Sequence, residues 1–397
     1  MSDEEVLRLL PIAAASVARR DDRADAQLAR LGAYDERDRA LVDRCLHAFL
    51  ASLVRAAWER GWAPADVVQY GRRELDAGIE PLLLAAISAE HQAYGVDTID
   101  PRWLDQLTDV GVTQPFAPLD LTSWAADARV GRYLLLHHAL SLAGFLQTLP
   151  IMARLFPLPG TPARAGRSTA VPANGKMLAR IRALLAKAEA TEFPDEAEAL
   201  SGKAQELMAK FSLDSALVEA EQELPDDSAA RRLWVDTPYV SAKAQLVGAV
   251  AAANRCRTVV IDSLAVVTVV GAELDLQHTE ILSTSLLVQA NRAMLAAGKQ
   301  AGRTRSFRQS FLMAYAMRIG ERLQATASAA EAAVPETDAQ RLLPALSQRE
   351  ERVEALFTRL FPNTTTRRTR ITNGAGWEAG LTAADQAKLD ARRQVRR

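Results

Sequence analysis

Arginine clusters are the feature of this sequence whose residue type and spacing most directly suggest chemistry. One cluster of three arginines lies at the start of the segment TRSFRQSFLMAYAM, and a second lies in residues 364–397, where eight lysines and arginines stand against three acidic residues. Guanidinium groups in loops and tails suit bidentate phosphate contacts. A solubilising or weakly docking tail is the alternative interpretation of the second cluster. The predicted nucleic-acid or anion contacts are Arg303, Arg305, Arg308, Arg367, Arg368 and Arg370.

Histidine and cysteine, the other residue types expected at a reactive site, form no motif. His137 and His138 lie in the apolar segment YLLLHHALSLAGFL and are predicted to be buried, hydrogen-bonded core or interface residues, with a metal or acid–base role as the alternative. Cys45 and Cys256 are far apart, which predicts neither a disulfide framework nor a structural zinc site. HEXXH, GxSxG, P-loop and GxGxxG patterns are absent. We therefore predict no catalytic residue, no metal site and no cofactor.

One glycine and two carboxylates leave an enzymatic alternative open. Gly271 ends a predicted strand and a helix is predicted to begin near Asp275, so exposed amides at this junction could hold an anion. A turn that simply needs the flexibility of glycine is the alternative. Glu273 and Asp275 lie where active sites often form, and they would act as carboxylates with perturbed pKa values in a concave site.

Composition describes an ordinary soluble protein with no overall electrostatic preference. The 397 residues are 49% hydrophobic, 24% charged and only 6% aromatic, with a formal net charge of −1. This length allows two or three domains. The N-terminus is acidic before its apolar run, and no run approaches the roughly 18 apolar residues of a membrane span. We therefore expect a cytoplasmic, multidomain protein with no membrane partner.

The apolar pattern predicts a mainly α fold with an N-terminal helical bundle, a central αα-hairpin and a small C-terminal α+β domain containing a β-hairpin. Five to seven helices are expected in the bundle, including helices over 35–62 and from 124 to 149. A segment rich in Pro, Gly, Ala and Ser follows the bundle and predicts a linker. The predicted parts are a helical bundle (1–155), a flexible linker (156–175), a helical hairpin (176–222), an α+β domain (231–335) and a charged helix with a basic tail (336–397).

The hairpin is predicted from two amphipathic stripes joined by a short turn. Met177, Ile181 and Leu185 share one face of the first helix, and Ala204 and Met208 share one face of the second. Because so small a core cannot stand alone, the pair must pack on another element. The outward charges are expected to pair across the hairpin. A phosphate-facing stripe of Lys176, Arg180, Arg182 and Lys187 is the alternative.

The C-terminal third changes from helical to mixed periodicity. Residues 257–263 and 265–271 are β-branched runs around a turn and predict a β-hairpin, to which RRLWVDT adds a third strand. Helices are expected over 241–254 and from 275 to about 298. Near the C-terminus, Gly376, Gly380 and Ala384 are spaced four apart, which predicts a short helix packed closely on the α+β domain, with Trp377 as an anchor.

Several of these segments resemble a known family. RALLAKAEATEFPDEAEAL and KAQELMAKF closely resemble the module called domain of unknown function 2786, found in actinobacterial and phage proteins. VVTVVGAELD and SFRQSFLMAYAMRIGERL are similar to the C-terminal companion domain of that family. The resemblance implies a helical module followed by that companion domain, and it implies no site residues because the family has no established activity.

Two function classes follow, with a third left open. The first is a non-enzymatic interaction protein that contacts nucleic acid or a protein partner through the helical hairpin and the arginine clusters. The alternative is an enzyme of unknown class with a carboxylate- or arginine-lined site in the C-terminal α+β domain. A structural, oligomer-forming role is the third.

Overall fold

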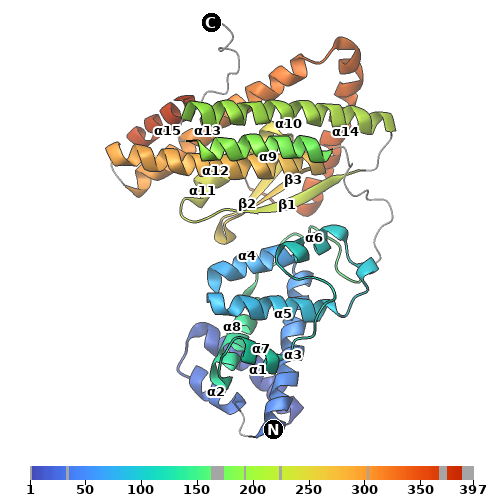
Figure 1. The fold of residues 1–397 in the computed structure, drawn as a ribbon, viewed down its shortest axis with the longest axis vertical. Coiled ribbons are helices and arrows are strands. Elements are labelled where there is room, and N and C mark those ends of the chain that lie inside the picture. The colour runs from blue at the N-terminus through green and yellow to red at the C-terminus, as the bar shows by residue number, and fades with distance from the viewer. Residues whose placement is uncertain are drawn as a thin grey trace. The chain divides into compact units, whose positions relative to one another are not determined.

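Two units of tertiary contacts divide the chain, Met1–Ala165 and Gly166–Arg397. The computed structural model describes residues 2–32, 35–161, 174–191, 194–222, 226–301, 304–365 and 373–386. Helices dominate both units, and the three strands of the described residues all belong to the second unit (Figure 1). The predicted mainly α fold with a C-terminal α+β part is confirmed.

The first unit is entirely helical in its regular elements. Its helices are α1 (Asp3–Arg19), α2 (Ala24–Leu31), α3 (Glu36–Glu59), α4 (Pro64–Glu74), α5 (Glu80–His91), α6 (Pro101–Asp109), α7 (Leu121–Asp127) and α8 (Arg132–Thr148), with 3-10 turns η1 (Ala77–Ile79) and η2 (Val96–Thr98).

Two details of the predicted bundle were wrong. The described part of this unit has eight α-helices rather than five to seven, because the N-terminal segment folds as α1 and α2. The continuous helix expected from 124 to 149 is broken between α7 and α8, where Arg129 adopts a φ of 55° that an α-helix does not accommodate. Around the long helices α3 and α8, the core is formed by residues such as Leu46, Leu50, Leu136 and Leu140.

The second unit combines a small sheet with long helices. Its elements are α9 (Asn174–Ala190), α10 (Pro194–Gln222), β1 (Ser228–Trp234), α11 (Val240–Ala253), β2 (Arg257–Ile261), η3 (Asp262–Leu264), β3 (Val266–Ala272), α12 (Glu273–Ala301), α13 (Arg305–Ala332), α14 (Glu336–Leu360) and α15 (Gly374–Gln386).

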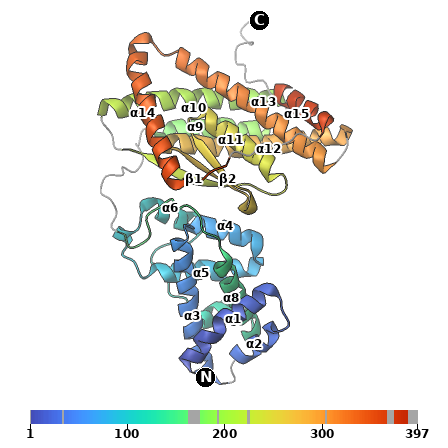
Figure 2. The ribbon, with the colours of Figure 1, turned by 180° about the vertical axis from the view of Figure 1, so that it is seen from behind.

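The sheet is antiparallel with strand order β1-β3-β2, so the predicted hairpin and the predicted third strand are both confirmed. Helices cover both faces. On one face Val267 and Val269 share a core with α11. On the other, Arg257 lies opposite Val270 in the register and stacks on Phe357 of α14, 4.6 Å from the ring centre. Figure 2, the view from the opposite side to Figure 1, shows α14 passing across this face of the sheet. Because both faces are covered, every residue of β3 is buried.

The hairpin of α9 and α10 packs on the helices that follow the sheet. Ile181 and Leu185 of α9 and Met208 of α10 belong to one core cluster with α11, α12 and α13. The predicted apolar stripes therefore face inward, against these helices rather than only against each other. Near the turn, Lys187 pairs with Glu196 at 3.1 Å, so charges do pair across the hairpin at that end.

The helix α15 lies directly against α13 and runs parallel to it. A Cβ atom added at Gly376 or Gly380 would stand within 3.0 Å of the carbonyl oxygen of Phe307 or Phe311, respectively. Only glycine allows such close backbone approach. Trp377 is partly buried against the same core. The packing predicted from the four-residue spacing is confirmed, and it brings the N-terminal ends of both helices together.

Adding a methyl group at Gly376 is expected to loosen α15. The Gly376→Ala variant must move the helix away from the Phe307 carbonyl, and overpacking of this kind costs about 1–3 kcal/mol. Gly374→Ala is the matched control, because a Cβ there meets no heavy atom within 4 Å. Hydrogen exchange of the α15 amides and chemical denaturation measure the effect. Equal stability of the two variants would contradict the close packing.

Candidate functional site

The start of α13 carries the only two predicted contact residues that lie within the described ranges. Arg305 is exposed and Arg308 is half-buried one turn later. The hydroxyl of Thr304 caps the helix by accepting the N–H of Phe307 at 3.2 Å. The other four predicted contacts, Arg303, Arg367, Arg368 and Arg370, lie outside the described residues.

This helix end is strongly electropositive. The backbone N–H groups of a helix give its N-terminus a partial positive charge, and α13 and α15 present their N-termini side by side (Figure 1). Neither first turn contains an acidic residue, a feature that these two helices share with α6, α7, α8, α9 and α11. No described carboxylate pairs with Arg305 or Arg308, and the buried Nε of Arg308 has no hydrogen-bond acceptor among the described residues. An anion bound here would compensate these charges.

A second group of cations lies on α9. Lys176 and Arg180 are exposed and have no carboxylate partner among the described residues. The N-terminal half of α9 packs near the start of α12, whereas Arg305 follows the end of α12. Because the 29 residues of α12 span roughly 43 Å, Lys176 and Arg180 lie far from Arg305. The structure therefore does not bring the α9 cations and the α13 arginines into one surface.

The Gly271 junction is filled rather than concave. Gly271 lies inside β3 without a positive φ, and a Cβ atom there would stand within 3.0 Å of the Cys256 sulfur. Close packing, not turn flexibility, therefore requires the glycine, so both interpretations offered for it were wrong. Glu273 pairs with Arg231 at 2.6 Å.

Asp275 belongs to a buried ionic network that joins three helices. Its carboxylate accepts the Ser212 hydroxyl of α10 at 2.7 Å and contacts the Arg349 guanidinium of α14 at 3.4 Å. Arg349 also binds Glu219 at 2.7 Å. Burial by itself lowers the pKa of Arg349, but the charges of Asp275 and Glu219 outweigh it and raise that pKa, so the guanidinium stays charged. The network is a structural cross-link with no access for a substrate.

Asp227 lies beside this network, and its pKa is raised. Burial and the negative charge of Glu219 raise its pKa to about 6, which the positive charge of Arg349 only partly offsets. A carboxyl with this pKa exchanges its proton near neutral pH.

The histidines occupy three different environments. His137 and His138 are half-buried and their Nδ1 atoms have no hydrogen-bond partner among the described residues, so the prediction of buried, hydrogen-bonded residues was wrong for both. His91 is buried with both nitrogens engaged, by the Ile87 carbonyl and by the Trp103 indole N–H, each at 2.8 Å. Such a histidine is neutral, and burial lowers its pKa.

His278 is the least expected of them. It is fully buried against Phe211, with ring centres 6.4 Å apart, and neither nitrogen has a partner among the described residues. Burial lowers its pKa to about 4. Within the described ranges, no group of three or more histidine, cysteine, aspartate or glutamate side chains is placed to hold a metal ion.

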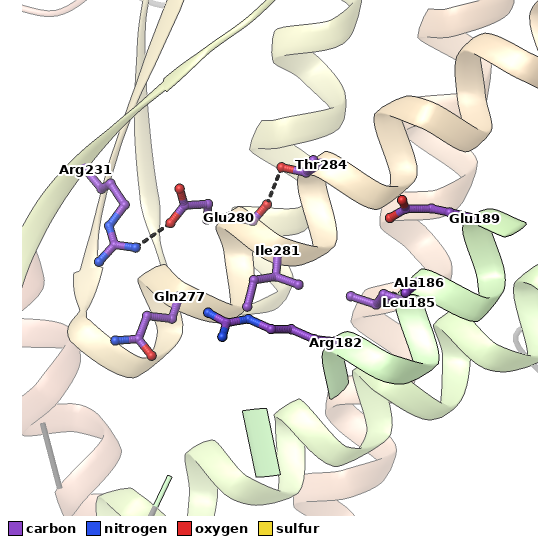
Figure 3. A pocket seen from close by; sticks show the side chains of 9 residues that line it. All are labelled: Arg182, Leu185, Ala186, Glu189, Arg231, Gln277, Glu280, Ile281 and Thr284. Atoms are coloured by element: carbon purple, nitrogen blue, oxygen red, sulfur yellow. Dashed lines mark hydrogen bonds and ion pairs between the residues drawn. The ribbon is translucent and has the colours of Figure 1, made fainter. Parts of the chain in front are cut away.

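A pocket of about 390 Å³ lies between α9, α12 and β1 (Figure 3). Arg182 of α9 and Arg231 of β1 both line it. Arg182 therefore does not belong to the outward stripe with Lys176 and Arg180, since two residues along a helix turn the side chain by about 200°. Sequence reasoning missed this pocket because its lining comes from three separate segments.

A family model matches the helical hairpin of the second unit. A model described as "Protein of unknown function (DUF2786)" matches residues 176–215, which cover α9 and most of α10. The resemblance of the hairpin to this module is thereby supported. No curated protein and no solved structure matches the chain. Among the described residues, no helix combines the length and the apolar character needed to cross a membrane.

Proposed function

We propose that the protein binds nucleic acid through phosphate contacts at the paired N-termini of α13 and α15. The observation that carries this proposal is the pair of first-turn arginines, Arg305 and Arg308, without a described carboxylate partner at a helix end that is already positive. Arginine in the first turn is unfavourable for an isolated helix, so its presence there is best explained by an anion.

The distribution of charge supports a polyanionic partner for the second unit. Residues 166–397 contain 31 lysines and arginines against 27 acidic residues, a formal charge of +4, whereas residues 1–165 carry −5. Arg303, Arg367, Arg368 and Arg370 lie outside the described residues and stay predicted phosphate contacts of the same proposal. A cytoplasmic location, and the identity of residues 231–335 as the companion domain of the DUF2786 module, belong to the same proposal.

Removal of both first-turn arginines is expected to weaken nucleic-acid binding and reduce its salt dependence. Each lost phosphate contact lowers the slope of log affinity against log salt by about 0.9 for duplex DNA, so Arg305→Ala/Arg308→Ala should reduce it by about 2. Fluorescence anisotropy of a labelled DNA duplex, and of DNA and RNA single strands, over a series of KCl concentrations measures the slope.

The double variant Lys176→Ala/Arg180→Ala is the matched control. It removes the same charge from exposed cations that have no partner among the described residues and that lie at the other end of α12, so it should leave the slope close to that of the unaltered protein. An equal reduction of the slope in both double variants would mean that nucleic acid is attracted to the positive charge of the protein without a specific site. Absence of salt-dependent binding to all three nucleic acids would remove the proposal.

The residues at which the enzymatic alternative was expected to form a site, Gly271, Glu273 and Asp275, are all engaged in packing or in ion pairs. Glu273 is engaged by Arg231, Asp275 by Ser212 and Arg349, and the space at Gly271 is taken by Cys256. Among the described residues, these contacts leave no open carboxylate pair at this junction.

A further inference from the structure

The pocket beneath α9 is a second site, separate from the α13 arginines. Its walls are two matching helix faces: positions 182, 185, 186 and 189 of α9, and positions 277, 280, 281 and 284 of α12. Both sets follow the i, i+3, i+4, i+7 spacing of a single helix face. Its volume of about 390 Å³ lies within the range of small-molecule pockets.

Four charged side chains line the pocket, and two of them, Arg231 and Glu280, are paired with each other among the described residues. Arg231 is held between Glu273, at 2.6 Å, and Glu280. Burial by itself lowers the pKa of Arg231, but the charges of these two carboxylates outweigh it and raise that pKa. By contrast, Arg182 and Glu189 have no ion-pair partner among the described residues. Within the described part of the chain, the pocket thus offers one cation and one anion without an ion-pair partner, and the Arg292 guanidinium binds the backbone carbonyl of Glu189.

These two charges lie at opposite ends of the pocket. Arg182 and Glu189 are seven residues apart on α9, which separates their positions by roughly 10 Å along the helix. Figure 3 shows the Arg182 guanidinium extending toward Gln277, with Glu189 at the far side. Between them, Leu185, Ala186 and Ile281 supply an apolar floor.

The Glu189 end also offers acceptors for a cationic ligand group. The Thr284 hydroxyl donates its proton to the Glu280 carbonyl oxygen at 2.9 Å, so its oxygen can only accept further hydrogen bonds. At the other end, the Arg182 guanidinium can donate to a carboxylate. The Gln277 amide already donates one hydrogen to Glu273 at 3.2 Å, and its second N–H can donate to the same ligand carboxylate.

We propose that this pocket binds a small zwitterion whose carboxylate and ammonium groups are about 10 Å apart, as in a peptide of three small residues. An extended chain spans about 3.3–3.6 Å per residue, so three residues cover a length similar to the axial spacing of positions 182 and 189 along α9. The carboxylate binds Arg182 and Gln277, the ammonium group binds Glu189 and Thr284, and the short side chains lie on the apolar floor.

Calorimetric titration of the full-length protein with trialanine tests the proposal. We expect saturable binding with a dissociation constant of about 1 mM or tighter, which suits a ligand of this size in an open pocket. N-acetyl-trialanine and trialanine amide each lack one charged end and should bind about tenfold more weakly. Alanine, whose charges are too close together to reach both ends, should not bind measurably.

Paired variants identify which ligand end each residue binds. Arg182→Gln should weaken trialanine binding about tenfold and leave the already weak binding of trialanine amide unchanged. Glu189→Gln should also weaken trialanine binding about tenfold, and it should leave the already weak binding of N-acetyl-trialanine unchanged. Arg180→Gln is the matched control, because it removes an exposed arginine from the same helix outside the pocket and should change neither.

Three results would overturn this assignment. They are absence of saturable trialanine binding, equal affinity for the charged and blocked peptides, and equal effects of Arg180→Gln and Arg182→Gln. Thermal unfolding of each variant shows that it is folded, and the exposed positions of Arg180 and Arg182 make loss of folding an unexpected result.

Discussion

Replacement of Arg349 by methionine is expected to lower the free energy of unfolding by about 3–5 kcal/mol, because it leaves buried carboxylates without their cation. The side chains of Arg349 and Asp275 are only 5% and 1% exposed. Methionine fills much of the space but cannot compensate Asp275, and Glu219 loses its 2.7 Å partner. Because the network joins α10, α12 and α14, its loss should also loosen α14 against the sheet.

Chemical denaturation measures this effect, and an exposed pair on the same helix is the control. Arg341→Met breaks the Arg341–Asp338 pair, whose side chains are 58% and 38% exposed, and should cost less than about 1 kcal/mol. The double variant Asp275→Asn/Arg349→Met should recover part of the stability, since it removes a buried charge together with its partner. If Arg349→Met costs no more than Arg341→Met, the network does not stabilise the fold.

Opposite pH dependences are expected from His278 and Asp227. Burial lowers the pKa of His278 from 6.5 to about 4, so unfolding takes up a proton in this range. Its contribution to stability is present above pH 6.5 and is lost, by about 3 kcal/mol, as the pH falls to 4. For Asp227, burial raises the pKa from 3.8 to about 6. Its contribution is present below pH 3.8 and is lost, by about 3 kcal/mol, as the pH rises through 6.

These two contributions should nearly cancel in the unaltered protein between pH 4 and 6, and single substitutions should reveal each of them. Relative to the unaltered protein, His278→Leu should gain about 3 kcal/mol as the pH falls from 7 to 4. Asp227→Asn should gain about the same amount as the pH rises from 4 to 7. Urea denaturation at a series of pH values measures both differences. Variants whose stability runs parallel to that of the unaltered protein across this range would contradict the assigned pKa directions.

His278→Leu has a second consequence at neutral pH. The substitution removes two buried nitrogens that have no partner among the described residues and retains a side chain that can pack on Phe211. Because an unpaired buried polar group is costly, the variant should be at least as stable as the unaltered protein at pH 7.

Local elements were predictable because their information lies in neighbouring residues. The β-branched runs around Asp262 predicted β2 and β3, and the stripes containing Ile181 and Met208 predicted the hairpin and its buried faces. The four-residue spacing of Gly376 and Gly380 predicted close helix packing, because only glycine leaves room for a neighbouring backbone. Errors arose where the signal was weak, as at the break between α7 and α8.

Sites were less predictable because they depend on which distant segments meet. The arginines at the start of α13 were visible as a cluster, but only the fold placed them beside the start of α15 and away from the cations of α9. Gly271 looked like a turn residue, and its requirement comes from Cys256 on the neighbouring strand segment, fifteen residues earlier. Nothing in the sequence indicated that His278 would be buried without a hydrogen-bond partner in the part of the chain that the structure describes.

The sequence by itself thus determined the helical character, the β-hairpin, the αα-hairpin and the close docking of α15, since periodicity, propensity and residue size act over a few neighbouring positions. The tertiary structure alone decided that Arg349 meets Asp275 across 74 positions, and that Arg182, Arg231 and Glu280 surround one pocket. Pairings of this kind depend on how helices and strands pack, and hydrophobic burial specifies that packing without marking the polar residues that it brings together.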